Sequence, residues 1–214
     1  MSEEKFDIIT EAEARCLPVG SSVVLKRGGH VTPLAADTLR DRRIRVVRED
    51  DVIPADLDGL APPAEVRRVA IGSDHTGVAL KAQLVEALRR RGLAVDDAGT
   101  NDTASVDYPD IAARVARAVA RGEADAGIVI DGAGLGSAVA ANKIPGVRAA
   151  MCSNETLARY SRQHNGCNVL TLGSTLLTVA EALRIVETWI STPMTEARYI
   201  RRLAKIRALE KPGP

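Results

Sequence analysis

Side chains that can move protons follow two of the apolar runs that predict β-strands. Asp74 and His75 come soon after residues 69–71, and Asp131 comes directly after residues 126–130. Carboxylates and imidazoles act as acids and bases near neutral pH. Ligands of open parallel sheets bind beyond the carboxyl ends of the strands, so these three residues are candidate catalytic groups. For Asp74 and His75 the alternative is an ordinary turn, in which aspartate is common.

The segment after Asp131 is rich in glycine. Gly132, Gly134 and Gly136 alternate with other residues, and Ser137 follows at the start of a helix-like stretch. The backbone N–H groups of such a loop can converge on an anion or on the oxyanion of a reaction intermediate. A tight turn and a dinucleotide-binding loop are the alternatives. The second is disfavoured because an acid precedes the loop and because the loop follows an interior strand.

A second group of polar residues falls nearer the C-terminus. His164 and Asn165 end a predicted helix, and Arg198 and Arg202 lie one turn apart on the last predicted helix. The imidazole adds to the acid–base candidates, and guanidinium groups bind phosphate through paired hydrogen bonds. Together with an anion-binding loop, this helix predicts a ligand that carries a phosphate. A solvated, charged helix face is the alternative for the arginines.

Strands and helices alternate from residue 66 onward. This pattern is typical of the α/β class, with a parallel sheet covered by helices on both faces. About five parallel strands are expected. The expected strands lie at residues 69–71, 93–95, 126–130, 148–151 and 169–172, and the expected helices include 78–91, 111–121, 178–189 with a capping box at its start, and 196–209.

The chain is expected to divide into three parts: an N-terminal extension at residues 1–48, a linker at 49–65 and a main domain at 66–211. The linker holds three prolines and several acids without helical or strand periodicity. In the extension, residues 22–25 and 44–47 predict strands and residues 33–42 predict a helix, a small α+β arrangement. Its few large apolar side chains make a marginal core, so the extension is expected to need a partner surface.

The composition disfavours several function classes. The 214 residues hold 29 Lys and Arg against 28 Asp and Glu, and only 2% are aromatic. A net charge of +1 and so few stacking side chains argue against nucleic acid as a partner. No apolar run approaches the roughly 20 residues that cross a bilayer, so a cytoplasmic protein without membrane contact is expected. The three cysteines lack the spacing of a zinc site, and no metal is expected.

In combination, these segments resemble the type B ribose-5-phosphate isomerases and their relatives that act on galactose 6-phosphate and allose 6-phosphate. The resemblance runs in order from about Val66 to Glu210. It is carried by Gly-Ser-Asp74-His75-Thr-Gly, Gly99-Thr100, Asp107-Tyr108-Pro-Asp110, Asp131-Gly-Ala-Gly-Leu-Gly136, Ala140-Ala-Asn142-Lys-Ile-Pro-Gly-Val-Arg148-Ala, Ser161-Arg-Gln-His164-Asn165, and the helix that bears Arg198 and Arg202.

The resemblance implies a Rossmann-like three-layer α/β/α fold and a homodimer or homotetramer with the site at the subunit interface. It also implies isomerisation of an aldose and a ketose phosphate through a cis-enediolate, without a cofactor. By the same resemblance, Asp74, His75 and His164 bind the sugar and help to open its ring. The expected catalytic residues are Asp74, Asp131 and His164, and the expected substrate-binding residues are His75, Tyr108, Gly132, Gly134, Gly136, Ser137, Asn165, Arg198 and Arg202.

The chain departs from the family pattern at the reacting centre. Asp131 stands where most members carry a catalytic Cys, and Ser137 stands where another group uses Glu. Ala133 replaces a Thr of the loop, and Thr175 replaces an Arg tied to phosphate. A desolvated carboxylate beside amide donors can take the C2 proton and return it at C1, so Asp131 is expected to be the base. The sugar is expected to be ribose 5-phosphate or a close relative.

Two other functions stay open. In the first, the protein binds a sugar phosphate without converting it, and Asp131 only anchors the loop. In the second, it is a nucleotide-dependent oxidoreductase that uses the glycine-rich loop for NAD. Proton exchange between substrate and solvent would separate these functions from isomerisation.

The extension itself contains a segment, residues 28–35, with the pattern G-x-x-V-T-P-L-A. This pattern weakly resembles a segment of bacterial microcompartment-associated enzymes. It implies recruitment of residues 1–48 to a microcompartment shell or to an enzyme partner, and a location inside such a compartment. A stabilising subdomain is the alternative.

Overall fold

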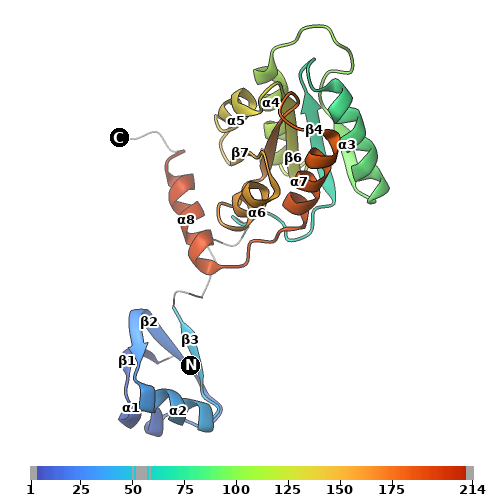
Figure 1. Ribbon diagram of the computed structural model, residues 1–214. Helices are drawn as coiled ribbons and strands as arrows, with labels where there is room; N and C mark the ends of the chain where they lie inside the picture. Colours follow the sequence, from blue (N-terminus) through green and yellow to red (C-terminus); the bar gives the residue numbers. More distant parts are fainter. Residues whose placement is uncertain (1–3, 50, 52–56, 58, 211–214) are drawn as a thin grey trace. The chain divides into compact units, whose positions relative to one another are not determined.

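The computed structural model describes residues 4–49, 51, 57 and 59–210 (Figure 1). The chain divides into two compact units. The first comprises Met1–Asp58 with Glu196–Arg198, and the second comprises Gly59–Thr195 with Tyr199–Pro214. Residues 50, 52–56 and 58 of the expected linker, and residue 211 of the expected main domain, lie outside the described residues.

The second unit is built on a five-stranded sheet in which every pairing is parallel, as predicted. Its strand order is β5-β4-β6-β8-β7, so β6 lies in the centre. All six residues of β6 are buried. The strands are β4 (Arg68–Ser73), β5 (Ala94–Asp97), β6 (Ala126–Asp131), β7 (Ala149–Met151) and β8 (Val169–Gly173).

Helices cover both faces of this sheet. One apolar cluster packs α3 and α7 onto the sheet, and a second packs α4 and α5 onto it, which makes three layers. The predicted Rossmann-like α/β/α fold is thereby confirmed. The helices are α3 (Val78–Arg90), α4 (Tyr108–Ala120), α5 (Leu135–Ala141), α6 (Glu155–Gln163), α7 (Val179–Ser191) and α8 (Ala197–Ala208).

Local sequence signals account for several of these boundaries. Gly92 and Gly122 follow α3 and α4 with φ of +86° and +70°, a conformation that glycine adopts without strain. The predicted capping box of α7 is present: the Thr178 side chain accepts from the Glu181 amide, and Glu181 accepts from the Thr178 amide. These signals set where each helix begins or ends, and so where the strand-end loops lie.

The first unit is a small parallel sheet with the strand order β1-β2-β3. Its elements are β1 (Lys5–Ile9), α1 (Glu11–Cys16), β2 (Ser22–Val31), α2 (Pro33–Asp41) and β3 (Arg45–Arg48). The extension therefore contains helices and strands as expected, but they alternate regularly along the chain. The sequence did not predict β1 or α1. The unit has a core of its own, made of Ile9, Ala14, Leu17, Val23, Leu25, Ala35, Leu39 and Ile44.

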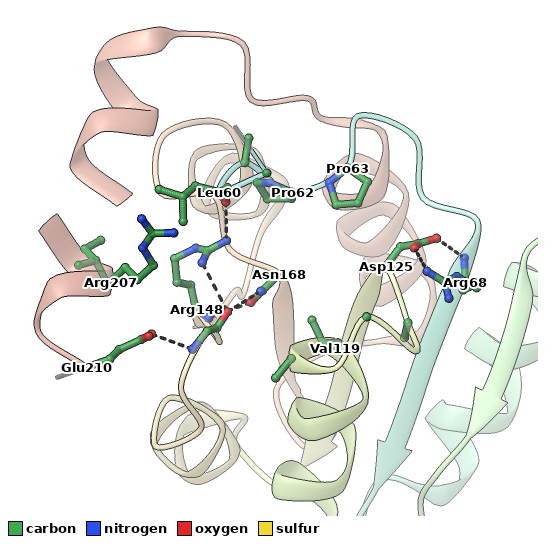
Figure 2. Close-up of a pocket in the computed structure, with 17 residues that line it drawn as sticks. Leu60, Pro62, Pro63, Arg68, Val119, Asp125, Arg148, Asn168, Arg207 and Glu210 are labelled. Atoms are coloured by element: carbon green, nitrogen blue, oxygen red, sulfur yellow. Dashed lines mark hydrogen bonds and ion pairs between the residues drawn. The ribbon is translucent and has the colours of Figure 1, made fainter. Parts of the chain in front are cut away.

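The last part of the expected linker is bound to the second unit. The Arg148 Nη2 donates to the Leu60 carbonyl at 3.1 Å, and the Arg162 Nη2 donates to the Pro63 carbonyl at 3.2 Å. Figure 2 shows the first of these contacts beside a cavity of about 390 Å³. Residues 60–63 are therefore part of the packed unit.

No helix among the described residues is long and apolar enough to cross a membrane.

Candidate active site

Asp131 ends the central strand β6, and its carboxylate is surrounded by amides of the loop that follows. The Ala133 and Gly134 amides donate to Oδ1, the first at 2.8 Å, and the Ser137 amide donates to Oδ2 at 2.9 Å. Only 5% of Asp131 is exposed. The glycine-rich loop does bind an anion, and that anion is the side chain of Asp131.

These contacts fix the charge of Asp131. Burial raises the pKa of its carboxyl, but the hydrogen bonds from Ser137, Gly134 and Ala133 outweigh burial, and the pKa lies below its ordinary value. Asp131 is therefore a buried carboxylate at neutral pH. Within the described residues, its charge is stabilised by hydrogen bonds from this loop.

The loop is held against β8 and the segment after it. The Thr171 hydroxyl donates to the Gly134 carbonyl at 2.7 Å, and the Thr175 hydroxyl donates to the Gly132 carbonyl at 2.6 Å. Gly134 has φ of +78°, and a Cβ there would meet the Leu172 carbonyl carbon at 2.9 Å. Both the left-handed backbone and this close packing require glycine at position 134.

Tyr108 reaches the same loop from the start of α4. A Cβ on Gly136 would lie 2.5 Å from Cζ of the Tyr108 ring, so the ring packs directly on this glycine. Tyr108 remains 40% exposed. Its phenol thus borders the loop while staying accessible to a ligand.

Asp74 and His75 lie at the end of β4, next to β6. The Asp74 amide donates to the carbonyl of Ile130, the residue before Asp131 on the neighbouring strand, at 3.0 Å. The Asp74 carboxylate accepts from the Thr76 hydroxyl at 2.6 Å, and the Ser174 hydroxyl lies 3.1 Å from that of Thr76. The His75 Nδ1 accepts from the Val106 amide at 3.4 Å, which leaves Nε2 to carry the proton of the neutral ring.

We call the group of residues at this end of the sheet the carboxyl-edge cluster, and it consists of Asp74, His75, Tyr108, Asp131 and Gly132–Ser137. The sequence predicted its main members, but it did not predict the neighbouring Thr76 and Ser174. Thr76 was recognisable from its position two residues after Asp74, because aspartate side chains commonly accept from that backbone position, as Asp74 does here at 2.9 Å. Ser174 gave no comparable signal.

His164, Asn165 and Arg202 lie at the opposite edge of the sheet, and we call them the amino-edge cluster. Helix α6 follows the carboxyl end of β7 and returns toward the amino ends of the strands, so its C-cap His164 lies there. The Gly166 carbonyl accepts from Arg148 Nε at 2.8 Å, and Arg148 directly precedes β7. Helix α8 reaches the same edge, because Glu210 accepts from the Gly146 amide at 2.8 Å (Figure 2).

One chain thus does not bring the expected site residues together. The carboxyl-edge and amino-edge clusters lie at the two ends of the same strands. Arg198 falls in the first compact unit, where its Nε lies 3.4 Å from Glu196 Oε2. Its position relative to either cluster is therefore not assigned.

The cysteines do not offer an alternative base. Burial raises the pKa of the Cys152 thiol and raises that of Cys167 to about 12. Cys16 is exposed and lies in the first unit. Within the described residues, no three His, Cys, Asp or Glu side chains are grouped so that they could hold a metal ion.

Several known proteins that are similar to this chain in sequence or in structure are named ribose-5-phosphate isomerase B. The curated ribose-5-phosphate isomerase B of Escherichia coli (strain K12) is 42% identical over 146 residues, which cover 68% of this chain and 98% of that protein. The solved structure of Clostridium thermocellum ribose-5-phosphate isomerase B is 48% identical, with a TM-score of 0.66, over 67% of this chain and 97% of its own. The solved structure of the Mycoplasma genitalium enzyme with bound ribulose-5-phosphate is 40% identical, with a TM-score of 0.66, and the match covers 68% of this chain and 97% of that one.

The similarity to the ribose/galactose isomerase family runs from β4 to α8. It includes the two strand ends that carry Asp74 and Asp131, the helix end that carries His164, and the helix that carries Arg202. The ribose/galactose isomerase model matches residues 69–206, more than half of the chain. The chain belongs to the ribose/galactose isomerase family.

Proposed function

We propose that this protein interconverts an aldose and a ketose phosphate, ribose 5-phosphate and ribulose 5-phosphate or a close relative, through a cis-enediolate. The observation that carries the proposal is the buried carboxylate of Asp131, held in a glycine-rich loop beside Asp74 and His75 in a chain of this family. The reaction needs a base that moves a proton between C2 and C1 and donors that stabilise the enediolate oxygens.

Asp131 supplies the base in this proposal. It is ionised at neutral pH. Each of its oxygens already accepts at least one hydrogen bond from a backbone amide, which makes the carboxylate a weak base. A weak base can still remove the proton where the enediolate oxyanion that forms is stabilised in the same step. The amides of Leu135 and Gly136 lie in the first turn of α5, where a helix offers them no acceptor, and they are the donors available to an enediolate oxygen.

We also propose that each site is built from two copies of the chain. The carboxyl-edge cluster of one copy would meet the amino-edge cluster of another, so that His164 and Asn165 act on the sugar and Arg202 holds its phosphate. Exposed apolar side chains on α5 and α6 supply a surface for the second copy: Leu135 at 60%, Val139 at 63%, Leu157 at 44% and Tyr160 at 49% exposed. A dimer or a tetramer would satisfy this arrangement.

Solvent deuterium incorporation tests the proposed reaction. The full-length protein is incubated in deuterium oxide with a panel of pentose and hexose phosphates, and deuterium at C1 and C2 is measured by mass spectrometry. Conversion with deuterium incorporation is expected for at least one sugar, without NAD. Binding without exchange would overturn isomerisation, and a requirement for NAD would indicate an oxidoreductase.

A second candidate is a protein that binds a sugar phosphate without converting it. One observation favours it: the carboxylate of Asp131 already occupies three amides of the loop that would otherwise face the substrate. In that case Asp131 is an anchor of the loop. The exchange experiment separates the two functions, because an anchor exchanges no proton.

For the N-terminal extension we propose recruitment in the cytoplasm, to a microcompartment shell or to an enzyme partner. What supports the proposal is that residues 4–49 have a sheet and a core of their own, separate from the unit that carries the family match. The alternative, a stabilising subdomain, predicts that the second unit depends on it.

A further inference from the structure

The imidazole of His164 contacts two tyrosine rings. The Tyr160 ring centroid is 4.7 Å away with an angle of 17° between the planes, a stacked pair. The Tyr199 ring centroid is 4.6 Å away with an angle of 34°. Aromatic residues make up only 2% of the chain, yet two of its three tyrosines contact this one histidine.

The three rings come from two helices. Tyr160 lies one turn before His164 on α6, and the His164 amide donates to the Tyr160 carbonyl at 2.9 Å. Tyr199 comes from α8, which is packed against the chain just after His164, because a Cβ on Gly166 would lie 2.7 Å from Leu203. The Arg202 guanidinium carbon lies 5.5 Å from the centre of the Tyr199 ring. The stack therefore connects His164 to Arg202.

We propose that Tyr160 and Tyr199 are positioning residues, which hold the His164 imidazole in one orientation and set Arg202 at a fixed place beside it. This inference rests on the proposed function, in which His164 helps to open the sugar ring and Arg202 holds the phosphate. Neither tyrosine is required to touch the substrate.

The physical reason is the freedom of a histidine at a helix end. His164 is the C-cap of α6 and is only partly buried, so its ring can turn about two side-chain bonds. Contact with two neighbouring rings restricts both rotations. Proton transfer to a sugar oxygen needs a nitrogen within hydrogen-bond reach, and misplacement by about 1 Å costs roughly a hundredfold in rate.

The two tyrosines are expected to differ in their effects. Tyr160→Ala removes one face of the stack and leaves α8 in place, so kcat is expected to fall about tenfold or more while KM changes little. Tyr199→Ala also removes the ring under Arg202, so kcat is expected to fall and KM for the sugar phosphate to rise. Tyr160→Phe and Tyr199→Phe keep the ring faces and are expected to retain activity within about twofold.

Matched controls come from the same helices. Arg159→Ala changes an exposed residue of α6 beside Tyr160, and Ile206→Ala changes a half-exposed residue of α8 two turns after Tyr199. Neither is expected to alter kcat or KM. Solution mass is measured for every variant, and the Phe variants keep the test valid if an Ala variant alters assembly.

Proton NMR reads the stack independently of catalysis. The chain has three histidines, and ring currents from two stacked tyrosines are expected to shift the His164 imidazole protons upfield of those of His30 and His75. Loss of that shift in the Ala variants together with loss of kcat supports the proposal. Loss of the shift with unchanged kcat and KM overturns it, as does absence of the shift in the wild type. Absence of isomerase activity in a wild type that shows the shift would instead overturn the proposed function.

Discussion

The two candidate functions differ in the role of one side chain, the carboxylate of Asp131. If it is the base, Asp131→Asn should lower kcat by a factor of about 10² to 10⁴, the usual contribution of a general base. Asn would also turn an NH₂ group toward loop amides that donate hydrogen bonds, so a loss of stability of about 2 kcal/mol is expected as well. Near wild-type turnover of Asp131→Asn would exclude the role of base.

Asp131→Cys separates chemistry from anchoring through its pH profile. A base must be deprotonated, and the pKa of Asp131 is held below its ordinary value, so wild-type activity should be independent of this group above about pH 5. An ordinary thiol loses its proton near pH 8.5, so the acidic limb of kcat/KM should move several pH units upward in Asp131→Cys. An unmoved limb would show that residue 131 is not the titrating base.

The same pKa has a consequence for stability. Because the folded-state pKa of Asp131 lies below the value in the unfolded chain, the carboxylate stabilises the fold above the unfolded value, near pH 4. That contribution is lost as the pH falls through the folded-state pKa. Asp131→Asn should therefore reduce the difference in unfolding free energy between neutral and acid pH.

The last part of the expected linker, residues 60–63, is held by the partly buried Arg148 and the buried Arg162. Arg162 is 1% exposed, donates to the carbonyls of Cys167 and Pro63, and lies 4.8 Å from the centre of the Trp189 ring. Burial lowers its pKa to about 10, so it remains charged at neutral pH. Arg162→Ala would leave two carbonyls unpaired and should lower the unfolding free energy by about 3 kcal/mol.

Fluorescence of Trp189, the single tryptophan, reports this loss for the second unit alone. Chemical unfolding of Arg162→Ala is compared with that of Arg159→Ala, an exposed arginine three residues earlier on α6. The control should stay within about 0.5 kcal/mol of the wild type. Equal unfolding midpoints for the two variants would mean that the segment at residues 60–63 is not held by Arg162.

The elements also show what the sequence could predict. Strong periodicity and glycine stops located β6, α3 and α7 within a residue or two. β1 was missed because four of its five residues are not buried, and α1 because six residues are too few for a helical period. β2 continues six residues beyond its predicted end through a polar stretch, because it is the central strand of the small sheet.

The site was predictable only where one strand end carries several polar residues. Asp131 and its loop follow a single buried strand, so sequence alone grouped them. The relation of His164 to Tyr199 depends on where α8 packs, and 35 positions separate the two residues along the chain. No periodicity or spacing in the sequence encodes such a contact.

A site shared between two copies of the chain can be tested by mixing inactive variants. Asp131→Asn alters the carboxyl-edge cluster and His164→Ala alters the amino-edge cluster, so each variant alone should be inactive. In a mixed dimer, one of the two sites would combine the wild-type amino-edge cluster of the Asp131→Asn chain with the wild-type carboxyl-edge cluster of the His164→Ala chain. Random exchange of subunits should then restore about a quarter of the wild-type activity.

The subunits are exchanged by mild denaturation and refolding, and each variant treated alone serves as the control. A mixture that stays inactive, although mixed dimers are detected by mass, would place the whole site in one chain. Light scattering on the wild type gives the dimer or tetramer on which the expected fraction depends.

The role of the extension can be tested by removing residues 1–58, which ends the deletion before Gly59 and keeps the bonds from Arg148 to Leu60 and from Arg162 to Pro63. If the extension serves recruitment, kcat, KM and the number of subunits in the assembly should match those of the full chain, because the core of the second unit is complete without it. The cellular location should change, and this is followed with a fluorescent fusion of each form in cells that build microcompartments. Aggregation of the shortened chain, or a lowered unfolding midpoint by Trp189 fluorescence, would instead assign the extension a stabilising role. Unchanged stability with an unchanged location would contradict recruitment, because the shortened chain would then carry everything that directs it.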